Sequence, residues 1–123
     1  MALITDAVFD TALAVIDTNG TRIDICSSEP GNYAAIAGVS LGNKTGLNTG
    51  APTDNTPTGR KVVVPAITDG SVTATGSAAY WALSNGSTTM YATGSITTPQ
   101  TVTNGNTFTL DAIDIAIADA TSV

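Results

Sequence analysis

The sequence has no histidine and only one cysteine, Cys26. Without histidine, the chain lacks the commonest general base and the commonest transition-metal ligand of proteins. A single cysteine excludes an intrachain disulfide, and with it the small secreted scaffolds that disulfides hold together. No histidine or lysine lies close to Cys26 in the sequence to lower the pKa of its thiol, so we expect this thiol to be inert.

Charged residues are also scarce, at 11% of the chain, whereas the usual share is about 25%. Much of the surface must therefore consist of Thr, Ser, Asn and Gly, as in proteins that pack against neighbours and in many β-sandwich domains. Ten acidic residues against four basic ones give a net charge of −6. Because nucleic-acid binding depends on Lys and Arg, we expect no nucleic-acid partner.

No apolar run is long enough to span a bilayer, so we expect no membrane partner. Residues 1–6 combine neither a basic stretch nor a long apolar run, so we expect no secretory signal. A chain of 123 residues has the usual length of one domain and can bury a core without disulfides or metals. We predict a single β-rich domain over residues 1–123.

The second half of the chain has the pattern of a β-meander. Short runs rich in Thr, Val, Ile and aromatic residues fill residues 72–119, separated by Asn-Gly pairs and a proline. Asn85-Gly86 is the strongest hairpin signal, because both residue types tolerate the positive φ angles of a type I′ turn. We predict a return strand over 88–95, and Pro99 interrupts the run that follows.

The apolar residues of the last predicted strand, 107–118, change faces part-way along it. Phe108 and Leu110 share one face by parity. The opposite parity holds Ile113, Ile115 and Ile117. A bulge or bend produces such a shift, and we place it near Asp111-Ala112.

Two shorter strands are predicted ahead of the meander. Residues 21–26 alternate, with Ile23 and Ile25 on one face, which indicates a strand with one buried face. Residues 61–67 form an apolar strand that Pro65 either ends or confines to a sheet edge.

Residues 5–18 carry the helical pattern of the chain. We predict an amphipathic helix packed on a sheet, with Thr5 as N-cap and Asn19-Gly20 as a left-handed C-terminal stop. A strand that extends the next one is the alternative. The apolar stripe consists of Val8, Phe9, Ala12, Leu13 and Ile16.

Residues 27–60 show no sustained period and contain six glycines and three prolines. Loops of this length are uncommon in compact domains and are often functional, and scattered apolar side chains argue against disorder. We predict an extended arm that orders against a partner, with a floppy surface loop or a short strand near 38–41 as alternatives. The candidate partner interface comprises Tyr33, Ile36, Val39, Leu41, Leu47, Arg60 and Lys61.

The sequence contains no convincing catalytic, cofactor-binding or metal-binding set. Asp111 and Asp114 lie close in sequence, but no nucleophile or second base accompanies them. Residues 17–24 place oxygen ligands at alternate positions, yet the glycine and the final glutamate of a calcium loop are missing. We therefore expect neither a cofactor nor enzymatic activity.

Three aromatic residues, Tyr80, Trp81 and Tyr91, lie around the predicted hairpin. Two interpretations stay open. These rings either pack in the core or form a platform on which sugars stack.

Several stretches, taken together, resemble a known type of protein. They are TRIDICSSEP at 21–30, YWALSNG at 80–86, YATGSITTPQTVTNGNTFTL at 91–110 and IDIAI at 113–117. In this order, after an N-terminal helix and a glycine-rich arm, they resemble small virion structural proteins of tailed bacteriophages, among them head decoration proteins. The resemblance covers most of the chain through loose, sheet-like motifs.

The resemblance implies a capsid-associated β-domain that is assembled into virions in the host cytoplasm. The expected partners are the major capsid protein or other virion proteins, and further copies of the chain in a dimer or trimer. The expected fold is an antiparallel β-sandwich or meander with one N-terminal α-helix and a long arm. A carbohydrate- or receptor-binding module of a tail or fibre is the alternative function.

Overall fold

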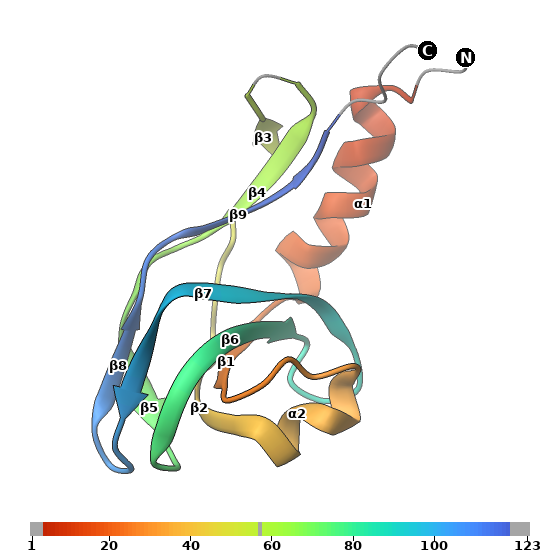
Figure 1. Cartoon of the computed structure of the whole chain (residues 1–123). Helices are drawn as coiled ribbons and strands as arrows, with labels where there is room; N and C mark the ends of the chain where they lie inside the picture. The colour runs from red at the N-terminus through yellow and green to blue at the C-terminus, as the bar shows by residue number, and fades with distance from the viewer. Residues whose placement is uncertain (1–3, 57, 119–123) are drawn as a thin grey trace.

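The protein is mainly β, as the sequence predicts (Figure 1). The computed structural model describes residues 4–56 and 58–118. Within these ranges the helices are α1 (Asp6–Asn19) and α2 (Tyr33–Val39). The strands are β1 (Arg22–Cys26), β2 (Ser40–Lys44), β3 (Thr53–Asp54), β4 (Arg60–Val64), β5 (Ile67–Val72), β6 (Gly76–Ser84), β7 (Met90–Val102), β8 (Thr107–Leu110) and β9 (Ile113–Ile117).

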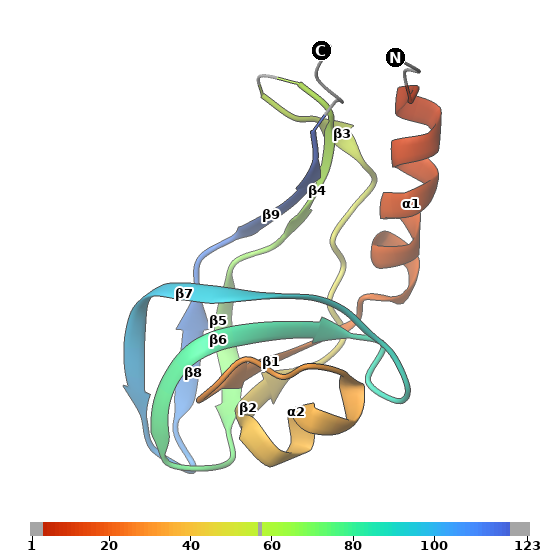
Figure 2. The same ribbon diagram turned by 45° about the vertical axis from the view of Figure 1, so that its right-hand side comes forward.

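The larger sheet has six antiparallel strands in the order β7-β6-β1-β2-β5-β8 and curls into an open half-barrel (Figure 2). Its central strand β1 is buried on both faces, so the prediction of one buried face is wrong. Ile23 and Ile25 belong to the main core, whereas Cys26 belongs to a second cluster with Ile36 of α2. The sequence pattern of β1 did not indicate that a helix would cover its second face.

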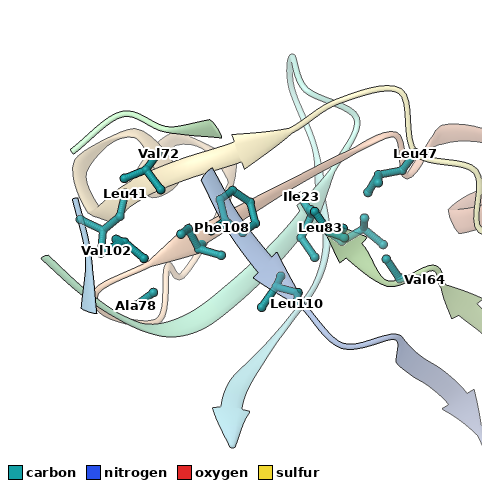
Figure 3. Packing of buried hydrophobic residues seen from close by; sticks show 12 residues of the cluster. Ile23, Leu41, Leu47, Val64, Val72, Ala78, Leu83, Val102, Phe108 and Leu110 are labelled. Atoms are coloured by element: carbon teal, nitrogen blue, oxygen red, sulfur yellow. The ribbon is translucent and has the colours of Figure 1, made fainter. Parts of the chain in front are cut away.

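The main core fills the half-barrel and consists of aliphatic side chains and one phenylalanine (Figure 3). Burying each such side chain contributes about 1.5–3 kcal/mol. Because the members come from seven strands and one connecting segment, the core joins parts of the chain that are far apart in sequence. They are Ile23, Ile25, Leu41, Leu47, Val64, Ile67, Val72, Ala78, Leu83, Val102, Phe108 and Leu110.

A smaller sheet, in the order β3-β4-β9, projects from the half-barrel with α1 alongside it (Figures 1 and 2). α1 packs against β4. The helix contributes buried Phe9 and Leu13, and the strand contributes buried Val62 and Val64. We call α1 and this sheet the projecting end.

An arginine network ties the projecting end together. The guanidinium of Arg60 on β4 donates from Nε to the Asp10 carboxylate of α1 at 2.7 Å and bonds to Asp54 of β3. It also donates from Nη2 to the carbonyl oxygen of Pro52 at 3.2 Å. The bond to Asp10 above all, and then the bond to Asp54, raise the pKa of Arg60.

One antiparallel ribbon of two chain segments passes through both sheets. β4 is followed by β5 after Pro65-Ala66, and β8 by β9 after Asp111-Ala112. β5 pairs with β8 in the half-barrel, and β4 pairs with β9 in the projecting end. The predicted shift at Asp111-Ala112 is therefore confirmed as the point where the chain changes sheets, and Pro65 ends β4 as predicted.

Residues 27–60 are not an extended arm. Asn32 caps α2 by accepting the N–H of Ala35 on its side-chain oxygen at 3.0 Å. β2 follows directly and pairs with both β1 and β5 inside the sheet. The N–H of Leu47 then donates to the carbonyl of Thr21 at 3.0 Å, which holds the next segment against the domain. Residue 57 of the predicted arm lies outside the described residues.

The predicted hairpin between β6 and β7 is confirmed, but its turn type is wrong. Gly86 has a positive φ of 79° and Asn85 does not, whereas a type I′ turn needs both. Instead the side-chain oxygen of Asn85 accepts the backbone N–H groups of Ser87, Thr88 and Thr89 at 3.0, 2.8 and 3.0 Å. The asparagine side chain, rather than a tight backbone turn, organises this loop.

Pro99 lies within β7 instead of breaking the strand. Residues 96–99 stand opposite the single Ala79 of β6, so β7 bulges there. A proline has no N–H to donate and is tolerated where the ladder is already interrupted.

The ends of α1 differ in detail from the prediction. Thr5 has the extended conformation of an N-cap, but its side chain makes no capping hydrogen bond. Gly20 ends the helix with φ −78°, which is not left-handed. A Cβ at Gly20 would lie 2.7 Å from the carbonyl oxygen of Ile16, so this position favours glycine for close approach.

Candidate functional site

The structure does not bring the seven predicted interface residues together on one surface. Ile36, Leu41 and Leu47 are buried in the chain's own clusters. Tyr33 and Val39 are half-buried and pack on the cluster beneath α2. The arm hypothesis required these side chains to be covered by a partner, and here the protein's own sheet covers them.

Arg60 and Lys61 are paired with the chain's own carboxylates. Lys61 Nζ lies 3.2 Å from Asp114 Oδ2, and Lys44 Nζ lies 3.0 Å from Asp69 Oδ2. The fourth cation, Arg22, is paired with Asp24. All four basic side chains are therefore engaged, and the uncompensated charge of the surface is acidic.

A buried carboxylate lies beneath α2. Asp24 is fully buried, and it accepts two bonds from the Arg22 guanidinium at 2.9 and 3.0 Å and one from the Ser40 hydroxyl at 2.7 Å. The bond to Asp24 raises the pKa of Arg22. A small hollow of about 180 Å³ is lined by this group and by α2. Because the carboxylate is buried and already accepts three hydrogen bonds from the chain itself, we assign this group to the packing of α2 and not to ligand binding.

Cys26 is inert, as the sequence indicates. Its side chain is fully buried, and burial together with the charge of Asp24 raises the pKa of the thiol to about 12. The thiolate, which is the reactive form, is therefore absent at neutral pH.

α1 presents apolar side chains to solvent as well as to the sheet. The exposed fractions are 57% for Val8 and 46% for Val15, and Ile4, just before the helix, is 51% exposed. We call Ile4, Val8 and Val15 the exposed stripe. Val8 and Ala12 belong to the apolar stripe predicted to pack on the sheet, and this prediction is wrong for both because both are exposed.

The exposed stripe is separated from the acidic residues of the helix. At about 100° per residue, Val8 and Val15 lie nearly opposite Asp6, Asp10 and Asp17 around the helix. The helix thus has a buried face, an acidic face and an apolar face. Val8 and Val15 are seven residues apart, which is about two helical turns. This spacing is visible in the sequence and could have revealed the third face.

β9 is an edge strand of the small sheet at the projecting end. It pairs with β4 on one side, and within residues 4–56 and 58–118 no strand pairs with its other edge. Ile113, Ile115 and Ile117 are half-buried, and the strand contains no proline. An edge of this kind is a template for pairing with another chain.

A larger hollow of about 430 Å³ lies on the open side of the half-barrel. Residues of β7 and its bulge line one wall, and residues 109–113 line the other. Gln100 Nε2 donates to the carbonyl oxygen of Thr109 at 3.1 Å across the opening. Trp81 of β6, which is half-buried, completes the lining.

Trp81, Tyr80 and Tyr91 do not form one platform. Tyr80 packs on the cluster beneath α2, on the other face of β6 from Trp81. Tyr91 is half-buried and is not part of the hollow's lining. Of the three predicted rings, Trp81 is the one that lines a hollow.

Comparison with protein families, with curated proteins and with solved structures finds no match.

In the described part of the chain, no three His, Cys, Asp or Glu side chains are grouped so as to hold a metal ion. No helix within the described ranges has the length and apolar character to cross a membrane. The exposed stripe with the β9 edge, and the hollow with Trp81, are the two surfaces that offer unused binding groups.

Proposed function

We propose that this chain is a structural protein of a bacteriophage virion, a head decoration protein that binds the major capsid protein through its projecting end. The proposal has two supports, the resemblance of the sequence to such proteins and the geometry of α1. It assigns the protein no enzymatic role. The half-barrel is then the rigid body that the projecting end attaches to the shell.

The observation that carries the proposal is the exposed stripe on α1. Ile4, Val8 and Val15 are each about half exposed, whereas Phe9 and Leu13 of the same helix are buried. Burying the exposed half of such a side chain yields about 0.8 kcal/mol or more, half of the value for a fully exposed one. The stripe is therefore a source of binding energy that the folded chain does not use.

The partner must offer a large surface. A stable interface needs roughly 800 Å² from each partner, more than one face of a four-turn helix supplies. The β9 edge at the same end of the molecule adds unpaired backbone donors and acceptors for an extended segment of the partner. A capsid shell, which presents large assembled surfaces, meets this requirement better than a small ligand does.

A capsid-binding experiment tests this assignment. We expect the Val8→Ser/Val15→Ser double variant to bind isolated capsids about tenfold more weakly, because the exposed halves of two valines, at about 0.8 kcal/mol each, correspond to slightly more than one factor of ten. Binding is measured by cosedimentation over a range of protein concentrations.

The matched control is Asp6→Ser, on the acidic face of the same helix. It should leave capsid binding unchanged, and circular dichroism should show that both variants keep the helix. Equal binding of the double variant and the wild type would contradict docking through the stripe. If the wild type itself does not bind capsids, the decoration role is wrong.

A further inference from the structure

We infer that the hollow between β7 and the β8–β9 connection binds a neutral saccharide. This inference is independent of the proposed function, because the hollow lies in the half-barrel and the exposed stripe lies on α1. The hollow's volume of about 430 Å³ falls within the range of small-ligand sites, roughly 300–1,000 Å³. It opens where the curled sheet fails to close, between its two edge strands.

The first element of the site is an aromatic surface. Trp81 pairs with Gly94 of β7. A Cβ on Gly94 would lie 2.8–3.0 Å from atoms of the indole, so the ring rests on the bare backbone of this glycine. The ring is thereby held in a fixed position beside the hollow. Indole rings combine a large apolar face with a polar N–H, which suits the C–H face of a pyranose ring.

The second element is a rim of unused polar groups. Ser95, Thr97 and Thr98 line one wall, and Asp111 lines the other. In the structure of the described residues, none of these four side chains makes a hydrogen bond within the chain. Ser95 is paired with Tyr80, on the other face from Trp81. The groups available to the hydroxyls of a ligand are therefore the hydroxyls of Thr97 and Thr98 and the carboxylate of Asp111.

The charge of the lining disfavours anionic ligands. Asp111 is the one charged residue of the lining. The four basic side chains of the protein are paired with carboxylates elsewhere. A phosphate, a sulfate or an acidic sugar would meet a carboxylate and no cation, which disfavours it.

A peptide strand is a poorer occupant than a sugar. Strand addition needs a regular edge with free N–H groups, but the β7 edge bulges at residues 96–99 and includes Pro99, which has none. On the opposite edge, the side-chain amide of Gln100 donates a hydrogen bond to the carbonyl oxygen of Thr109, so this acceptor is already in use. These features protect both edges from pairing while leaving the hollow open.

The protein contains a single tryptophan, so its intrinsic fluorescence reports on this site directly. We expect a saturable change in emission when neutral hexose oligosaccharides are added. Acidic oligosaccharides of the same length, and glycerol at the same hydroxyl concentration, should produce none. A preference for the acidic oligosaccharides, an equal response to glycerol, or no response to any sugar of a broad neutral panel would overturn the inference.

Variants of the rim locate the binding. Thr98→Ala/Asp111→Ala should weaken the affinity at least fivefold, whereas Thr101→Ala, an exposed residue on the same strand outside the lining, should leave it unchanged. Saturation-transfer NMR on Trp81→Phe, with its fold verified by circular dichroism, should show reduced transfer to the sugar. Equal affinities in the rim variant and the control would also overturn the inference.

The Val8→Ser/Val15→Ser variant separates the two proposals. It should retain full saccharide binding while capsid binding falls. Loss of both activities in a folded variant would contradict the independence of the two surfaces.

Discussion

On the central strand β1, Cys26 lies beneath α2, in a position where ionisation of its thiol is strongly opposed. The carboxylate of Asp24 lies on the same strand, and both side chains are fully buried. The pKa of the thiol rises from its ordinary value of 9.0 to about 12, first through burial and then through the charge of Asp24. The folded protein therefore keeps the proton on sulfur at a pH at which the unfolded chain has lost it.

This difference makes stability depend on pH in the alkaline range. Between pH 9 and 12 the unfolded state binds one proton fewer than the folded state, so the free energy of unfolding falls by about 1.4 kcal/mol per pH unit. Below pH 9 the contribution is fully present. We expect Cys26→Ala to lack this part of the slope, as measured by urea unfolding at a series of pH values. Equal slopes in the two proteins would contradict the assignment.

At the scale of elements, the hairpin between β6 and β7 depends on one side chain. Asn85 accepts three backbone N–H groups on a single oxygen. We expect Asn85→Ala to lower the free energy of unfolding by about 1–2 kcal/mol, because these donors lose their fixed acceptor and must find water. Urea denaturation measures this difference.

Ser87→Ala in the same loop is the control. Its hydroxyl is exposed and makes one long contact of 3.4 Å, so the change should stay within about 0.5 kcal/mol. A loss for Asn85→Ala as small as that of the control would show that Gly86 alone fixes the turn.

Elements with a strong local signal could be predicted from the sequence. The helix over 5–18, the hairpin at Asn85-Gly86 and the shift at Asp111-Ala112 each follow from chemistry within a few neighbouring residues. α2 could not be predicted, because seven residues give fewer than two turns and the glycines around it suggest a loop. Its capping residue, Asn32, was the one local signal for a helix start.

The candidate sites were harder to predict for a different reason. Whether Ile36 and Leu41 face a partner or their own sheet depends on tertiary packing. The local sequence pattern around these residues carries no information about that packing. Conversely, Val8 looks like a core residue by spacing, yet only the face that contains Phe9 and Leu13 meets the sheet. Trp81 could be named from sequence, but the hollow beside it results from a bulge and from an open barrel edge.

At the scale of the whole molecule, the charge distribution predicts the absence of one activity. The net charge is −6, and each of the four basic side chains lies within 3.2 Å of a carboxylate. Binding to duplex DNA requires several free cations that displace counterions. We expect no change in the fluorescence anisotropy of a labelled duplex at about 50 mM salt, the low-salt condition at which such binding is strongest.

A lysine-rich DNA-binding domain is the positive control for this measurement. Salt-dependent binding of the duplex by the present chain would show that its ion pairs open at little cost. It would also contradict the view that its surplus surface charge is acidic.

The antiparallel ribbon formed by β4–β5 and β8–β9 has a mechanical consequence. A load applied along its length acts across hydrogen bonds that run perpendicular to the strands, so many of them must break together. A load that lifts β9 sideways from β4 breaks them one after another. The molecule should therefore resist tension along the ribbon far better than peeling at its tip. If the projecting end is the attachment site, as proposed, the ribbon is best placed to carry tension directed straight outward.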